Sequence, residues 1–344
     1  MKRPLLMIVS MLLAAAPGRA FERVYSLGDK IDGSRLIVLA KVAEVRELAP
    51  AKRPAGEQVV GDYLYRLEVR DVLKGVGKPR EVIVIHSPEF RSDKRCYLPD
   101  SLVIAFLNPN GLSDRFLRAY RLGRRPYHRN FAQRQGTLVV GDSTAPLHAE
   151  AIRRYLAAKQ AKPRQRPAKW AALLDLDVPE LKESALSELT AAPYYPARDA
   201  FITCLADENL TSYACKNLAL LSPDSLYDRL DMLLLLSRTD SRRVRVNLLK
   251  LVAPLRDDRV FKLLQKSLKD EQFEVRATAA KGLEHWNDKK AVKSLKKALG
   301  DEDDFVRNAA YEALTKQGFK IEQKDDGYYR IISEPTVKDI PWLK

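Results

Sequence analysis

Two pairs of lysines recur at a fixed distance along the C-terminal half of the chain. Lys262 and Lys266 return 31 residues later as Lys293 and Lys297. Residues four apart lie on one face of an α-helix, and a constant period stacks such faces in neighbouring units. If these helices line the concave side of a curved array, the lysines form a basic groove for an acidic peptide or another polyanion. The alternative is a solvated helix face.

A second group of basic residues alternates with aromatic residues in a segment that reads as a loop. Arginine beside aromatic side chains is common at recognition surfaces, and binding residues often lie on loops. The loop is a candidate site for a protein partner or for an anionic envelope polymer; the alternative is a loop that is solvated or packed on acidic helices. Its residues are Tyr120, Arg121, Arg124, Arg125, Tyr127, His128, Arg129, Phe131 and Arg134. As candidate partner-binding residues we select Arg124, Arg125, Tyr127 and Arg129.

The short motifs of common enzyme classes are missing from the sequence. There is no GxSxG, HExxH, P-loop or GxGxxG pattern. His86 and His148 each lie near a glutamate in sequence, a pattern more typical of structural or solvated histidines. We expect no catalytic residue, no metal site and no cofactor, and hence a non-enzymatic protein. The signatures of nucleic-acid-binding domains are not present either.

Three cysteines allow at most one disulfide within the chain. Cys204 and Cys215 lie 11 residues apart, and residues 207–209 between them have turn-forming types. On two antiparallel helices joined by this turn they can face each other, and an oxidising compartment favours a bridge. The alternative is two buried thiols. Cys96 then stays single, and no CxxC pattern supports a redox motif or a structural zinc site.

The first 20 residues have the pattern of a cleavable secretory signal. Lys2 and Arg3 precede an apolar run over residues 5–16, and small residues lie before a cut at Phe21. We therefore expect a periplasmic or secreted protein whose mature form starts near Phe21 and has no transmembrane segment. The mature chain carries 57 basic against 45 acidic residues. Such a charge suits anionic lipid headgroups, polyanionic polysaccharide or acidic proteins.

The first half of the mature chain has the alternation of β-strands. Turn residues separate the runs, no helical pattern lies between them, and residues 49–59 read as a loop. Such a series favours a small antiparallel barrel. The expected strands are residues 36–45, 63–73, 81–86 and 102–107, with shorter candidates at 117–122 and 137–140.

The order of these segments resembles the netrin-like domain, an OB-type barrel also found in tissue inhibitors of metalloproteinases. The resemblance covers about residues 22–140, and its most specific pieces are Val69-x-x-Val72-Leu73-Lys74-Gly75 and Cys96-x-Leu98-Pro99. The sequence lacks a second cysteine to pair with Cys96. It also lacks the N-terminal cysteine through which those inhibitors chelate zinc, since the mature start is Phe21. Inhibition by that mechanism is therefore not implied.

Helical periodicity replaces the alternation after the barrel. Residues 146–159 predict one helix, and residues 162–167 read as a basic, proline-bearing linker. We expect a barrel domain at 21–145, a helix and linker at 146–168, a helical domain at 169–319, and a hairpin and tail at 320–344. The turn in this hairpin, Asp325-Asp326-Gly327, is followed by apolar residues, so the hairpin can cover the open end of the helical domain.

The helical domain repeats with a period of 31 residues. Val244-Arg245, Val275-Arg276 and Val306-Arg307 mark successive units, and apolar residues keep constant offsets from each valine. A period near thirty indicates stacked helical hairpins, none of which buries its apolar face alone. The sequence thus predicts an α-solenoid of about five hairpins over residues 170–318.

These units resemble HEAT repeats of the short kind found in phycobilisome-linked lyases. Asp270 precedes Arg276 by six residues, and Asp301 precedes Arg307 by six. The resemblance implies that these aspartates and arginines form a ladder between repeats. We expect an exported scaffold that binds a protein partner on the concave face of the solenoid. A lyase or enzyme accessory subunit is an alternative, but it needs a bilin or acidic catalytic pocket for which we find no residues.

Overall fold

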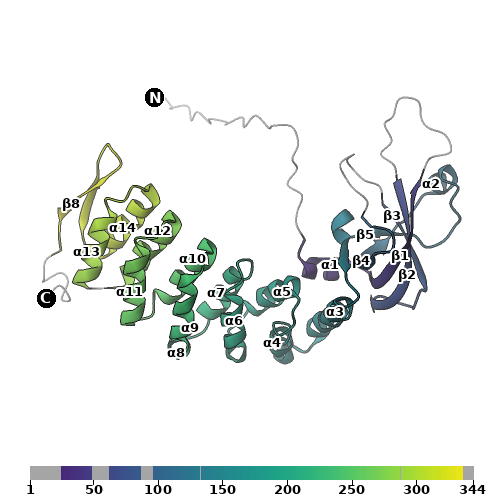
Figure 1. Ribbon diagram of the computed structural model, residues 1–344, viewed down its shortest axis with the longest axis horizontal. Coiled ribbons are helices and arrows are strands. Elements are labelled where there is room, and N and C mark those ends of the chain that lie inside the picture. The colour runs from purple at the N-terminus through teal and green to yellow at the C-terminus, as the bar shows by residue number, and fades with distance from the viewer. Residues whose placement is uncertain (1–24, 49–61, 87–95, 132, 287, 336–344) are drawn as a thin grey trace, which may run out of the picture.

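The computed structural model describes residues 25–48, 62–86, 96–131, 133–286 and 288–335. The signal peptide expected at residues 1–20, the loop expected at 49–59 and the end of the tail lie outside these ranges. A β-barrel occupies one end of the molecule, and a curved row of helices leads from it to a β-hairpin at the other end (Figure 1).

The N-terminal half forms the expected barrel. Each strand pairs with the next in the order β1-β2-β3-β5-β4, and pairing of β1 with β4 closes the ring. β6 pairs with β4 as well. The strands are β1 (Leu36–Leu48), β2 (Asp62–Lys74), β3 (Glu81–His86), β4 (Leu102–Pro109), β5 (His128–Asn130) and β6 (Thr137–Val140).

Two details of the barrel differ from the prediction. β3 and β5 are parallel where they meet, at Val84 and His128, because a long connection returns the chain to the same end of the barrel. The strand expected at residues 117–122 is not formed, because residues 117–119 belong to a helix, α2 (Asp114–Ala119). The Ser113 hydroxyl caps the first turn of this helix by accepting from the Phe116 amide. The helix buries Leu117 against the end of the barrel.

The motif that carried the netrin-like resemblance has a structural role. Lys74, at the end of β2, donates through its ammonium group to the carbonyl of Ile31, 2.6 Å away, in helix α1 (Leu27–Gly33). The next residue, Gly75, has a φ of +120°, and a Cβ there would lie 2.9 Å from a Leu36 methyl carbon. Only glycine suits that turn, which holds α1 against the barrel.

The barrel and the helical array share one hydrophobic core. Ile37, Ile104 and Phe106 of the barrel belong to the same buried cluster as Ile152 and Trp170. The expected linker at 162–167 is a 3₁₀ turn, Pro163–Gln165, followed directly by α4 (Arg166–Ala171). The apolar residues on both sides of this segment are buried together, so the predicted domain boundary is a packed junction.

The helices after the junction pair in succession along the row. Helix α3 (Ala145–Gln160) packs on α4, and the short α8 (Asp224–Tyr227) precedes α9. The pairs are α4 with α5 (Pro179–Leu189), α6 (Arg198–Cys204) with α7 (Thr211–Ala219), α9 (Leu230–Leu235) with α10 (Arg242–Val252), α11 (Asp258–Ser267) with α12 (Phe273–Gly282), and α13 (Lys289–Ala298) with α14 (Asp304–Lys316).

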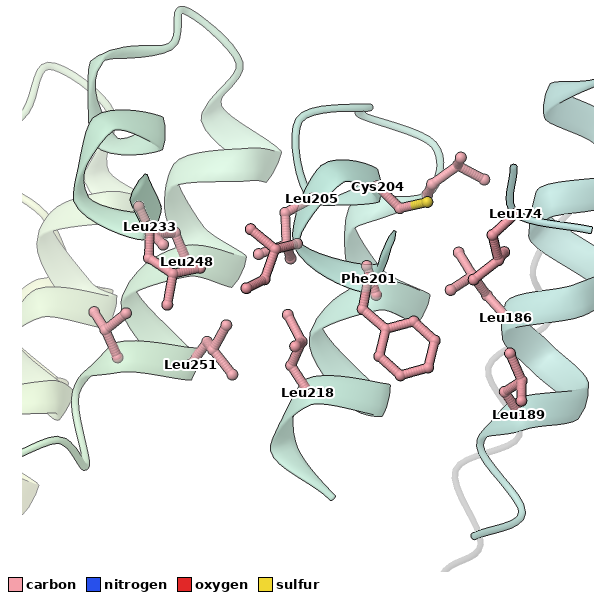
Figure 2. Packing of buried hydrophobic residues seen from close by; sticks show 14 of the residues in the cluster. Leu174, Leu186, Leu189, Phe201, Cys204, Leu205, Leu218, Leu233, Leu248 and Leu251 are labelled. Atoms are coloured by element: carbon pink, nitrogen blue, oxygen red, sulfur yellow. The ribbon is translucent and has the colours of Figure 1, made fainter. Parts of the chain in front are cut away.

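The expected inward positions of the repeat are confirmed. Val244, Val275 and Val306 are each 0% exposed, on α10, α12 and α14. Between the pairs, leucines from successive helices meet in a continuous apolar layer, as Figure 2 shows for Leu205, Leu218, Leu233, Leu248 and Leu251. No pair buries its apolar side without its neighbour.

The array has two layers that differ in spacing. Helices α7, α10, α12 and α14 contact one another in succession, whereas α9, α11 and α13 show no comparable contact with each other. Since the more closely packed layer of a bent array lies on its concave side, the first set forms the inner layer and the second the outer layer (Figure 1). Small residues such as Ala279 and Ala280, both fully buried, permit the close approach in the inner layer.

A hairpin of β7 (Lys320–Gln323) and β8 (Tyr329–Ser333) covers the last repeat. Tyr329 stacks on Tyr311 of α14 at 4.8 Å between ring centroids. The hairpin therefore occupies the place of a further repeat. Among the described residues, every helix is too short or too polar to pass through a lipid bilayer.

Candidate protein-binding surface

The ladder that the HEAT resemblance implies runs between repeats. The Arg276 guanidinium donates to both carboxylate oxygens of Asp301 in the next repeat, each at 3.0 Å, and to the carbonyl of Asp270 in its own. Arg245 donates a single hydrogen bond to the Asp270 carboxylate, at 3.0 Å. Hydrogen bonds to Asp301 raise the pKa of the Arg276 side chain, although burial opposes them. These paired charges fix the angle between repeats and are not free to bind a partner.

The last arginine of the ladder has no following repeat. Arg307 instead donates to the carbonyl of Gly327 at 3.3 Å and lies 4.5 Å from the centre of the Tyr328 ring, both in the hairpin. It also contacts Asp304. The hairpin thus satisfies the end of the ladder, and with the barrel at the other end it leaves the inner face as the long uncovered surface of the array.

The exposed side of the inner layer mixes charged, polar and apolar groups. On α14, the stripe opposite the buried Val306 contains Phe305, which is 67% exposed, together with Asn308 and Glu312. Phe305 stacks on Phe273 of α12 with 5.7 Å between ring centroids. The equivalent stripes of α10 and α12 present Arg243, Val246, Lys250, Glu274, Ala277 and Lys281. An exposed aromatic ring amid mixed charges is the composition of many protein interfaces.

The four lysines selected from the sequence lie on the outer layer. Lys262 and Lys266 belong to α11, and Lys293 and Lys297 to α13; all four are exposed. The predicted concave lysine groove is therefore wrong. The helices with the Val-Arg motif and paired alanines pack more closely and occupy the inner side, which leaves the lysine-bearing helices outside.

The arginine-rich loop is less available than its sequence indicated. Tyr127 is only 6% exposed, packs beneath α2, and donates its hydroxyl to the carbonyl of Gly123 at 2.8 Å, so its selection as a binding residue is wrong. Arg124 contacts Asp114 at 2.9 Å, and Arg125 contacts Glu81 at 3.5 Å. Arg129 lies exposed on β5.

The proposed disulfide is not formed. Cys204 and Cys215 are free thiols on α6 and α7, and Cys96 forms no disulfide with either of them. The Cys215 sulfur points to the next repeat, where it donates to the carbonyl of Asn247 at 3.3 Å. Burial raises the pKa of Cys204 and raises the pKa of Cys215 to about 11. The turn between the helices brings the two cysteines into one hairpin, but their sulfurs serve different packing contacts.

We expect all three thiols to react with a disulfide reagent in denaturant without prior reduction, and Cys204 and Cys215 to react slowly in the native protein. At pH 8 a thiol of pKa 11 is ionised in only about one molecule in a thousand. The folded state holds the proton of the Cys215 thiol more tightly than the unfolded state does. The contribution of this thiol to the free energy of unfolding is therefore complete below about pH 8.5 and is lost as the pH rises toward 11. A Cys96→Ser variant identifies the fast site, and only one reactive thiol in denaturant would indicate a bridge.

The described ranges contain no cluster of three or more His, Cys, Asp or Glu side chains suited to hold a metal ion. His86 is buried in the barrel. The Nδ1 atom of His148, near the start of α3, lies 2.9 Å from the carbonyl oxygen of Thr144. Both histidines thus lie within the framework of the fold rather than at the inner face.

Sequence reasoning missed the exposed phenylalanine of the inner face. Phe305 directly precedes the Val-Arg motif of the last repeat, at a position that holds Glu274 and Arg243 in the two preceding repeats. A large apolar residue at a position otherwise charged was the available signal. Its meaning depends on knowing which layer faces inward.

Part of the helical array matches a known family of repeats. Residues 230–315 match the family of HEAT repeats. Among solved structures, the chain is similar to an engineered protein from a structural genomics consortium, with 18% identity, a TM-score of 0.36, and coverage of 51% of this chain and 92% of that one. It is also similar to Cex1p, with 17% identity and a TM-score of 0.39 over 52% of this chain and 41% of that one.

A third similar structure is a designed armadillo repeat protein in complex with the peptide (KR)4. It is 15% identical, with a TM-score of 0.36 and coverage of 51% of this chain and 95% of that one. No curated protein sequence matches the chain. The fold is thus a barrel followed by an array of helical pairs, and within this array residues 230–315 match HEAT repeats.

Proposed function

We propose that this protein is a non-enzymatic interaction scaffold that binds a protein partner on the inner face of its helical array. Arrays of this type present extended concave surfaces, and the HEAT match covers the repeats that form the most regular part of that surface. The signal-like pattern of residues 1–20 supports export to the periplasm or the exterior.

We further assign the barrel to the OB type and to the netrin-like group. The strand order β1-β2-β3-β5-β4 with closure onto β1, and the parallel β3–β5 contact, support the first assignment. The structural roles of Lys74 and Gly75 support the second, since both belong to the motif that carries the resemblance. The barrel packs on the array through a shared core, so its role in the scaffold includes closing the first end of the array.

The observation that carries the proposal is the exposed Phe305–Phe273 pair on the inner layer. The Phe305 ring is 67% exposed, so its stacking on Phe273 covers only a small part of its apolar surface and leaves the rest in water. A ring of this kind, bordered by the charges of Glu274 and Lys281, is suited to insert into a pocket of a partner. Hydrophobic burial would supply affinity, and the charges would set orientation.

The alternatives have less support. The arginine-rich loop has two of its guanidinium groups already paired with carboxylates, at Asp114 and Glu81, which reduces its use as a polymer receptor. The lyase accessory role has no feature of the described residues in its favour.

The test compares capture of proteins from an envelope extract by three forms of the chain, identified by mass spectrometry. A partner of the inner face should be retained by the wild type, and its capture should fall at least tenfold with Phe305→Ala, since aromatic anchors commonly contribute 2 kcal/mol or more, that is about 30-fold. Leu235→Ala is the matched control, because Leu235 is 59% exposed on the outer layer. Equal capture by all three forms would refute the inner-face proposal.

A further inference from the structure

The outer layer of the last two repeats carries the densest basic surface among the described helices. Helix α13 contains five lysines and no carboxylate between Lys289 and Ala298. Two more exposed lysines lie on α11, and the side chains of Gln265 and Ser294 join the two helices by a hydrogen bond of 3.1 Å. We define the outer lysine face as Lys262, Lys266, Lys293 and Lys297 together with the neighbouring Lys269, Lys289, Lys290 and Lys296.

The arrangement of these charges is only partly favourable to the helices. Lys266 and Lys297 lie in the last turns, where the helix dipole favours positive charge. Lysines spaced by four residues on one helix repel each other, as in Lys262 with Lys266 and Lys293 with Lys297. Lys290 lies in the first turn of α13, where the helix dipole favours negative charge. The helix begins well nevertheless, because Asp288 caps it by accepting from the Lys290 amide at 2.5 Å. The helix dipole thus accounts for Lys266 and Lys297, but not for Lys290 or for the recurrence of lysine pairs four residues apart.

The arginines and lysines of the array are used differently. Arg245, Arg259 and Arg276 each contact a carboxylate of a neighbouring segment. By contrast, the part of the chain that the structure describes shows no ion pair for Lys262, Lys266, Lys293 or Lys297. The guanidinium groups hold the repeats together, and these four ammonium groups remain available to a ligand.

The spacing of the rows suits a long anionic chain. Residues four apart are separated by about 6 Å along a helix, and the Gln265–Ser294 hydrogen bond holds the row on α11 beside the row on α13. A hollow of about 480 Å³ on α13 is lined by Lys289, Val292, Lys293, Lys296, Lys297 and Glu334. A flexible polymer with regularly spaced charges can follow this surface and place acidic groups in the hollow.

A membrane surface fits this face less well. Basic helices that lie on bilayers also insert large apolar side chains, and the large exposed apolar residues of the described ranges include none on α11 or α13. The face lies on the convex side of the arc (Figure 1), so its two rows diverge from a flat plane. A chain that bends with the surface contacts both rows.

We infer that the outer lysine face binds a linear polyanion whose repeating groups are phosphates or carboxylates. This site is separate from the inner face and does not depend on the protein partner proposed above. The four ammonium groups would each release a counterion from the polymer, so binding weakens steeply with salt. A scaffold with both sites would hold its protein partner against an anionic polymer.

The test measures binding of the full chain to fluorescent linear polyphosphate and to polygalacturonate by anisotropy at several NaCl concentrations. The variant replaces Lys262, Lys266, Lys293 and Lys297 by Gln. We expect its affinity for the preferred polymer to fall at least about tenfold, and the slope of log affinity against log salt to decrease by about 3, from about 0.7 per phosphate contact. The polymer that the wild type binds with the higher affinity shows whether the preferred anionic group is phosphate or carboxylate.

The matched control replaces Lys162, Lys216, Lys250 and Lys281 by Gln, which removes the same charge from other exposed positions. It should bind within about twofold of the wild type, as should Phe305→Ala, because both leave the outer face intact. Since the outer-face variant relieves like-charge repulsion, its Tm should not be lower than that of the wild type. Equal loss in both lysine variants, no loss in either, or tighter binding of anionic phospholipid vesicles than of either polymer would overturn the inference.

Discussion

Replacing Asp301 by Ala is expected to lower the free energy of unfolding by about 3 kcal/mol, because removal of one partner of a buried ion pair leaves an uncompensated charge. The side chains of Arg276 and Asp301 are only 10% and 14% exposed, and two hydrogen bonds of 3.0 Å join them. Asp301 also accepts from the Asp303 amide at 3.0 Å, so the same change weakens the start of α14. Urea unfolding followed by circular dichroism measures the loss.

Asp231→Ala provides the comparison for this experiment. Asp231 contacts Arg259 at 2.7 Å, but its side chain is 86% exposed and that of Arg259 is 45% exposed. Exposed pairs of this kind are worth only about 0–1 kcal/mol. A loss below 1 kcal/mol for Asp301→Ala, or equal losses for both variants, would contradict a structural role for the ladder.

Replacing Trp170 by Ala is expected to cost about 3–5 kcal/mol, the range for removal of a large buried aromatic ring. Trp170 is 3% exposed and lies edge-on to Tyr155 of α3 at 5.0 Å between ring centroids. Because Trp170 fills the core between barrel and array, we expect one urea transition for the wild type and two for the Trp170→Ala variant. Circular dichroism and amide hydrogen exchange report the two parts separately.

The control for the junction is Trp286→Ala. Trp286 is half-buried and packs on Phe261 at 5.1 Å within the array, so its loss should destabilise the last repeats without uncoupling the barrel. If Trp170→Ala retained one transition with a loss below 1 kcal/mol, the shared core would not join the two halves energetically.

Local patterns were sufficient to predict most of the elements. Alternation in residues 63–73 and 81–86 predicted strands that the structure contains as β2 and β3, because the period of side chains in a strand is short and visible in sequence. The strand predicted at residues 117–122 was wrong. Its apolar residues fit a strand, but Ser113 and Asp114 start a helix that includes residues 117–119. The parallel β3–β5 contact escaped prediction because it depends on how a long connection returns to the barrel.

Binding positions were harder to predict than elements. Tyr127 had the residue type of a recognition site, yet the fold buries it under α2. Cys204 and Cys215 had the spacing of a bridge, yet each sulfur takes its own packing position. Residue type and spacing state what a side chain can do, and only its surroundings decide whether it is exposed or paired.

The sequence by itself determined that a β-rich half precedes a helical array with a 31-residue period. It also determined that Val244, Val275 and Val306 point into the hydrophobic core in successive units. Only the tertiary structure decided which helices form the concave layer. Periodicity identifies the buried side of each helix, but the direction in which stacked pairs bend depends on how closely each layer packs. That packing places Phe305 on the inner face and the four lysines on the outer one.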